Sequence, residues 1–242
     1  MKRLHASPAL LLLLAALAAP TSASADLSFN LGAVSDYRFR GLSQSRLRPA
    51  VQGGVDFASG GLYAGAWASS IQWIRDAGGD SRGELDVYGG IRGEFAPGLS
   101  WDLGLLRYQY IDHALPVSPN TTEVYAALGW GVATLKVSHS LRNLFGTAGS
   151  KGSTYADLSA GFDLGDGFTL TPHLGYQKVA HNDDLSYADV AVGLSKDFGG
   201  FSLSASAVHA DVKKVGGAPV YASPKGRNLG RTTVVLGVQA DF

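Results

Sequence analysis

The last twelve residues, 231–242, read RTTVVLGVQADF, and from Thr232 onward every second residue is apolar or small. The interleaved residues are mostly polar or very small. An alternation with a period of two predicts a β-strand that has one face in an apolar medium and the other in water. The segment is also long enough to cross a bilayer, for which a tilted strand needs about 9–11 residues.

The same alternation recurs along most of the chain, in segments bounded by glycine, proline and other turn residues. It predicts twelve strands, at 27–40, 49–58, 61–72, 82–95, 99–111, 121–130, 132–141, 153–164, 167–179, 186–198, 200–211 and 230–242.

The connections between these strands alternate in length. Five are short turns, and six are longer polar links, at 41–48, 73–81, 112–120, 142–152, 180–185 and 212–229. Short turns at one end and long loops at the other are typical of an outer-membrane β-barrel, in which the short turns are periplasmic. The predicted fold class is therefore all-β, an up-and-down antiparallel transmembrane β-barrel of about 12 strands. An even strand count places both termini on the periplasmic side.

A soluble β-sandwich or a lipocalin-like barrel is the alternative fold, and the alternation alone does not exclude it. A soluble barrel would turn its apolar face inward and its charges outward. The polar face of this chain is rich in glycine, serine and threonine and also carries acid–base pairs, which suits a water-filled lumen better. The pattern therefore favours the membrane barrel.

Composition excludes several other classes. The 242 residues include no cysteine, and 20 basic side chains balance 20 acidic ones. The absence of cysteine excludes disulfides, thiolate nucleophiles and cysteine-ligated metals. The balanced charge argues against a nucleic-acid partner, since nucleic-acid binders carry a basic excess.

The N-terminus has the three parts of a secretory signal: Met1-Lys2-Arg3, an apolar run at 9–19, and the small-residue pattern Ala23-Ser24-Ala25. We therefore expect residues 1–25 to be a cleaved signal peptide and residues 26–242 to form the barrel. Within the barrel, a change of phase near Leu105-Leu106 predicts a β-bulge.

Four stretches resemble the TorF-type porin family of proteobacterial outer-membrane proteins. They are SDYRFRGLSQS (35–45), PAVQGGVDF (49–57), GLYAGAWAS (61–69) and ELDVYGG (84–90). The resemblance implies a β-barrel of the channel type, with no settled substrate and no assigned catalytic residue. Phe242 is similar to the terminal aromatic residue by which the barrel-assembly machinery recognises many outer-membrane barrels.

Charged and polar residues on the predicted lumen face are the candidate site. Opposed charges across a pore would bias which ions and solutes enter; the alternative is that these groups only pair and fill the interior. Barrels of eight strands are filled by side chains and those of 16–18 are open, so twelve strands favour a narrow passage over a plugged one. The predicted pore-lining residues are Asp36, Arg38, Arg40, Gln52, Asp56, Glu84, Asp86, Arg92, Glu94, Lys136, Asp157, His173, Asp189 and Arg231.

The function predicted from these features is an outer-membrane channel for passive diffusion of small hydrophilic solutes or ions, with no catalytic residue, metal or cofactor. Its expected partners are outer-membrane lipid, lipopolysaccharide and the assembly machinery, with homo-oligomers also possible. A barrel enzyme and a structural barrel with a blocked lumen are the alternatives. The segment 139–143 reads HSLRN and lacks the His-x-Ser-Asn spacing of outer-membrane phospholipases.

The longest loop, 212–229, leaves two possibilities open. It carries Lys213, Lys214, Lys225 and Arg227. It could fold inward as a constriction or contact anionic lipid headgroups.

Overall fold

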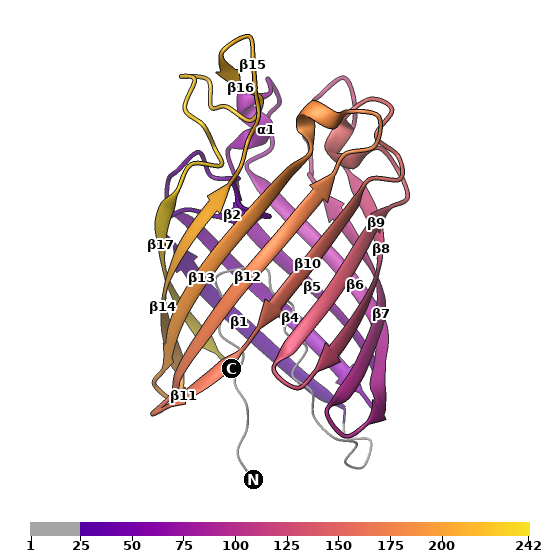
Figure 1. The fold of residues 1–242 in the computed structure, drawn as a ribbon, viewed down its shortest axis with the longest axis vertical. Coiled ribbons are helices and arrows are strands. Elements are labelled where there is room, and N and C mark those ends of the chain that lie inside the picture. The colour runs from indigo at the N-terminus through magenta and orange to yellow at the C-terminus, as the bar shows by residue number, and fades with distance from the viewer. Residues whose placement is uncertain (1–24) are drawn as a thin grey trace.

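The computed structural model describes residues 25–242, so residues 1–24 of the predicted signal peptide lie outside it. The described chain forms a closed antiparallel β-barrel of twelve strands (Figure 1), which confirms the predicted fold class. The strands are β1 (Asp26–Val34), β4 (Ala50–Ser59), β5 (Leu62–Ser70), β6 (Gly83–Ala96), β7 (Leu99–Gln109), β8 (Thr121–Trp130), β9 (Ala133–Ser140), β10 (Thr154–Ala160) continued by β11 (Phe162–Gly165), β12 (Phe168–Lys178), β13 (Tyr187–Asp197), β14 (Phe201–Ala210) and β17 (Thr233–Asp241).

Each strand pairs with its neighbour in sequence, and β1 closes the barrel by pairing with β17. The segments β10 and β11 both pair with β12 and therefore act as one interrupted strand. The interruption at Gly161 lies beside Pro172 of β12. The ring nitrogen of Pro172 carries no hydrogen, so it cannot donate a backbone hydrogen bond to the neighbouring strand.

The two faces of the barrel wall differ as the alternation predicts. Large apolar side chains point outward, and Val234 and Leu236 are 64% and 57% exposed. Serines on the opposite face, including Ser195, Ser202 and Ser206, are buried toward the interior. This arrangement is the reverse of a soluble barrel, which hides its apolar face.

The long links lie at one end of the barrel and the short turns at the other (Figure 1). The long links contain a short helix α1 (Trp73–Asp76), the 3-10 turns η1 (Leu144–Gly146) and η2 (Asp183–Leu185), and the small hairpin of β15 (Lys214–Val215) and β16 (Ala218–Pro219). The C-terminus lies at the short-turn end. None of the helices within residues 25–242 is long and apolar enough to cross a membrane.

The prediction of a β-bulge near Leu105-Leu106 is wrong. Pairing of β6 with β7 runs without a shift through this point, and the shift lies between Glu94 and Ala96, next to a short turn. The change of phase has another cause: Leu106 packs inward against an apolar cluster, while neighbouring Arg107 donates to Thr122 Oγ1.

The first predicted strand, 27–40, is also too long, because β1 ends at Val34. Val34 pairs with Gly237 on one side and with Ala50 on the other. Residues 35–48 therefore leave the wall of the barrel before the chain returns to it at Ala50.

Candidate functional site

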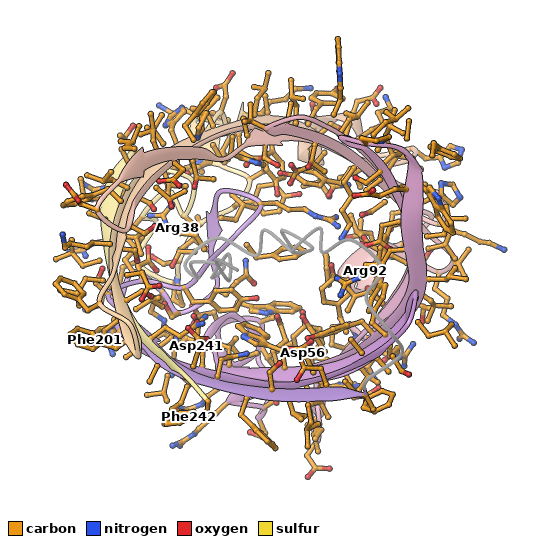
Figure 2. The ribbon with its side chains drawn as sticks, turned by 90° about the horizontal axis from the view of Figure 1, so that it is seen from below. Arg38, Asp56, Arg92, Phe201, Asp241 and Phe242 are labelled. Atoms are coloured by element: carbon orange, nitrogen blue, oxygen red, sulfur yellow. The ribbon has the colours of Figure 1, made fainter. Side chains whose placement is uncertain are left out.

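Residues 35–48 form a hairpin inside the barrel, hereafter the lumen hairpin. Its two short strands, β2 (Arg38–Phe39) and β3 (Leu42–Ser43), pair with each other and not with the wall. Viewed along the barrel, Arg38 lies inside the ring of strands (Figure 2). Both central residues of the turn have positive φ, 47° at Arg40 and 77° at Gly41, as a two-residue hairpin turn of the I′ type requires.

The tip of the lumen hairpin crosses the interior and binds the opposite wall. Arg40 Nη2 lies 2.7 Å from Glu123 Oε2 of β8, and Nη1 donates to Gln177 Oε1 of β12 at 2.7 Å. The guanidinium also lies 4.3 Å from the centre of the Tyr155 ring. Burial alone would lower the pKa of Arg40, but the Glu123 carboxylate raises it, and the pKa is higher than usual overall. Arg40 therefore stays charged.

The base of the lumen hairpin is fixed by Asp36. This buried carboxylate accepts hydrogen bonds from Arg38 Nε at 2.6 Å and from the hydroxyls of Ser43 and Ser45 at 2.5 and 3.1 Å. Asp36 thus closes the hairpin on itself and is not directed toward an open passage.

The last part of the long loop 212–229 holds the lumen hairpin from a second side. Arg38 Nη1 donates to the carbonyl oxygens of Leu229 and Arg231 at 2.9 and 3.3 Å, and Ser43 N donates to Leu229 O at 3.0 Å. Leu42 packs in a cluster with Tyr187 and other residues of this region. The segment that folds inward is therefore 35–48, with the end of loop 212–229 bracing it.

Aromatic rings fill the space between the lumen hairpin and the long-loop end. Phe39 contacts Tyr108 and Phe145 edge-on, with ring centres 5.4 and 5.6 Å apart. Trp73 of α1 lies 5.0 Å from Tyr110 in the same arrangement. Edge-on pairs of this kind add to the energy of burial. The hairpin, α1 and η1 therefore share one apolar cluster inside this end of the barrel.

Two carboxylates of β6 lie buried beside the lumen hairpin. Glu84 accepts a hydrogen bond from Tyr37 Oη at 2.6 Å, and burial together with Glu84 raises the pKa of Tyr37 well above its usual value. Asp86 is 1% exposed, and within residues 25–242 neither of its carboxylate oxygens has a hydrogen-bond partner. A buried carboxylate without a partner is unfavourable, so this layer is costly in free energy unless water or an ion enters it.

The lumen wall near the short turns carries charged side chains of both signs. Asp56 accepts a hydrogen bond from Tyr88 Oη at 2.5 Å, and both Asp56 and Arg92 point into the ring (Figure 2). Lys136 Nζ lies 3.8 Å from the Tyr125 ring centre, and Glu94 is exposed. Positive and negative groups of the wall therefore face the interior here, and within residues 25–242 none of them is hydrogen-bonded to the lumen hairpin.

Glycines on the lumen face leave space for tyrosine rings to lie along the wall. A Cβ placed on Gly65 would meet the ring of Tyr88 at 2.6 Å, and one on Gly175 would collide with Tyr155. The glycine content of the strands is in part explained by these close approaches.

His173 joins two carboxylates of the wall. Its Nε2 lies 2.8 Å from Asp189 Oδ1 and its Nδ1 3.5 Å from Asp157 Oδ1. Tyr155 Oη donates to Asp189 Oδ2 at 3.0 Å. Within the described residues, no group of three or more His, Asp or Glu side chains is arranged to hold a metal ion.

His139 and Ser140 lie on opposite sides of β9. His139 is exposed, whereas Ser140 is completely buried on the other face. Adjacent residues of a strand point in opposite directions, so these two cannot act as base and nucleophile together.

The predicted pore-lining residues divide into two groups. Asp36, Arg38 and Arg40 belong to the lumen hairpin, and Arg231 is exposed and precedes β17, so these four are not on the strand positions predicted for them. The other ten residues are predicted to border a conducting path, and this stays a prediction. They lie on wall strands: Gln52 and Asp56 on β4, Glu84, Asp86, Arg92 and Glu94 on β6, Lys136 on β9, Asp157 on β10, His173 on β12 and Asp189 on β13.

Sequence reasoning missed the partners of the lumen hairpin. Glu123 and Gln177 hold Arg40, and Tyr108 and Phe145 pack against Phe39. The alternation in segment 121–130 could have identified Glu123 as a lumen residue, but no sequence signal paired it with Arg40.

A family profile matches residues 18–242, and the printed description of that family is "Bacterial protein of unknown function (Gcw_chp)". This description does not include the TorF-type designation, which remains a resemblance. No curated protein matches the chain.

Several solved barrels share the fold at low sequence identity. "KdgM porin" is 11% identical with a TM-score of 0.56, over 89% of this chain and 99% of that one. "NanC porin" is 10% identical with a TM-score of 0.55, over 90% and 99%. The "COG4313 outer membrane channel from Pseudomonas putida F1" is 10% identical with a TM-score of 0.50, over 92% and 96%. Identity at this level establishes a shared fold.

Proposed function

Because the chain belongs to the Gcw_chp family of bacterial proteins of unknown function, we propose its function from the barrel itself. It is an outer-membrane channel that lets small hydrophilic solutes or ions diffuse through a narrow charged lumen. The observation that carries this proposal is a closed barrel that is apolar outside and lined inside by polar and ionisable side chains. No catalytic step is assigned to it.

The outer surface supports placement in a bilayer. In lipid every backbone polar group must be bonded within the protein, and a closed barrel achieves this. The exposed apolar side chains of β17, such as Leu236, would contact lipid tails. With the short turns on the periplasmic side, both ends of the mature chain would be periplasmic and the long loops would face lipopolysaccharide.

The C-terminal residue, Phe242, supports a contact with the barrel-assembly machinery. Phe242 is 76% exposed, and it points away from the barrel interior (Figure 2). Its accessible ring suits recognition during membrane insertion. Assembly into homo-oligomers stays an untested expectation.

The passage is narrowed on one side by the lumen hairpin. Its tip residue Arg40 reaches the wall at Glu123 and Gln177, so solutes would have to pass beside it. Asp56, Arg92, Glu94 and Lys136 would then bias ion entry from the short-turn end by charge. The names of the similar solved barrels, porins and a channel, support the same assignment, as does the resemblance to TorF-type porins.

A barrel with a blocked lumen is the second candidate. It is favoured by one observation, the apolar cluster that joins the lumen hairpin to α1 and η1 inside the long-loop end. In that case the protein would have a structural or adhesive role in the membrane.

Swelling of liposomes separates the two. Purified protein is inserted into vesicles, which are then diluted into isosmotic arabinose or raffinose, with protein-free vesicles as the control. A narrow channel predicts swelling in arabinose and much slower swelling in the larger raffinose. No swelling in arabinose and no ionic current across a planar bilayer, with the barrel shown to be folded, would contradict the channel and favour the blocked barrel.

A further inference from the structure

A pocket of about 190 Å³ lies at the long-loop end, where the exit of the lumen hairpin meets loop 212–229. One water molecule needs only ~10–15 Å³ of such space, so the pocket can hold a polyatomic group. Four of its six lining residues are basic and none is acidic: Arg46, Arg48, Ser223, Pro224, Lys225 and Arg227.

Most of these positive charges are not neutralised by the protein. Arg46 Nε donates to Asp76 Oδ2 at 2.8 Å. Within residues 25–242, no carboxylate forms an ion pair with Arg48, Lys225 or Arg227, and all three are exposed. Like charges gathered around one pocket repel one another, and a bound anion would relieve that repulsion.

The charge is concentrated in these two segments and not spread over the loops. Residues 35–49 and 211–232 together carry nine basic and two acidic side chains. The other four long links, 71–82, 110–120, 141–153 and 179–186, carry four basic and five acidic ones. Four of these nine basic residues line the pocket.

Both walls of the pocket are held by hydrogen bonds. Arg46 and Leu47 have positive φ, 61° and 59°, which is unusual for residues with side chains. Leu47 N donates to Ser43 Oγ at 2.8 Å, which fixes this turn to the lumen hairpin. On the other wall, Ser223 N donates to Arg227 O at 2.9 Å. A site whose walls are already ordered loses less entropy on binding.

We propose that this pocket binds a phosphate-bearing anion at the mouth of the barrel. Arginine side chains suit such groups because the guanidinium can donate two parallel hydrogen bonds to one of them. The anion could be a small solute or a phosphate of lipopolysaccharide, which present the same chemistry. The site does not depend on whether the lumen conducts.

The test compares two double variants that remove equal charge from the same loop. Lys225→Gln/Arg227→Gln alters the pocket, whereas Lys213→Gln/Lys214→Gln leaves it intact. Binding to purified protein in detergent is measured by calorimetry with two pairs of probes: glucose 6-phosphate against glucose, and bisphosphorylated against dephosphorylated lipid A. Heat-modified gel mobility verifies that each variant is folded.

We expect at least one phosphorylated probe to bind more tightly than its unphosphorylated partner, and the one that does identifies the source of the anion. The pocket variant should weaken that binding about tenfold or more, since charge-assisted hydrogen bonds are lost, and the control variant less than about twofold. The proposal would be overturned by equal weakening in both variants, or by no preference for either phosphorylated probe.

Discussion

The two halves of the lumen carry similar residues in different surroundings. Beside the lumen hairpin, Asp86 and Glu123 are 1% and 2% exposed. Near the short turns, Glu94 is exposed and Arg92 is half-buried. Strand β6 carries Asp86 beside the hairpin and Arg92 and Glu94 nearer the short turns, so one strand contributes to both regions. The half of the lumen that the hairpin fills is hereafter the packed half. The half that contains Arg92 and Glu94, to which no hydrogen bond of the hairpin reaches within residues 25–242, is hereafter the open half.

This difference separates the roles of similar side chains. In the packed half, charges such as Glu123 fasten the lumen hairpin to the wall. In the open half, charges such as Arg92 face the interior, where the Arg92 guanidinium lies 5.2 Å from the centre of the Tyr63 ring. Charge removal should therefore affect stability in the first half and ion preference in the second.

The largest effect is expected for Glu123→Ala, matched by Glu94→Ala in the open half. Loss of Glu123 leaves Arg40 buried without its anion, and breaking one side of a buried pair costs about 3–5 kcal/mol. Urea unfolding in detergent should show a much lower midpoint for Glu123→Ala and little change for Glu94→Ala. Equal midpoints for the two variants would mean that the halves do not differ as described.

A smaller effect is expected for Gly175→Ala, matched by Gly161→Ala. The new methyl group at position 175 would collide with the Tyr155 ring. A methyl group added at position 161 would meet no heavy atom of another part of the chain within 4 Å. Overpacking costs roughly 1–3 kcal/mol. The unfolding midpoint should fall for the first variant only, and an unchanged midpoint for Gly175→Ala would show that Tyr155 can move away from the wall.

The smallest effect on stability, under about 0.5 kcal/mol, is expected for Arg92→Gln. Removing this positive charge from the open half should shift the reversal potential in a KCl gradient toward cation preference. Arg107→Gln, which removes an equal charge from the side of β7 opposite Leu106, should leave the reversal potential unchanged. The same shift of the reversal potential in both variants would mean that the position of the charge inside the lumen does not cause the change in ion preference.

The sequence predicts the barrel wall well because its signal is local. Alternation in each segment depends on whether a residue faces inside or outside, and the predicted 121–130 coincides with β8. The two faces of β17 are likewise those expected from RTTVVLGVQADF.

The lumen hairpin was missed because its contacts are distant in the chain. Arg40 binds Glu123 and Gln177, which lie 83 and 137 residues away. Arg38 and Arg40 alternate with Phe39 as residues of a wall strand would, so the prediction extended that strand to residue 40. The same limitation led to the bulge prediction at Leu106. This apolar residue keeps the regular inward position of β7, and the aromatic cluster around the hairpin gives it apolar neighbours there.

The most direct test of the account is the single-channel conductance of a barrel without the lumen hairpin. Val34 and Ala50 are paired partners, so a Gly-Ser-Gly link can replace residues 36–48 without altering the wall. We predict current steps for the natural chain and several-fold larger steps for the shortened one in planar bilayers. A folded, shortened barrel with no current steps, or with steps of unchanged size, would contradict the account.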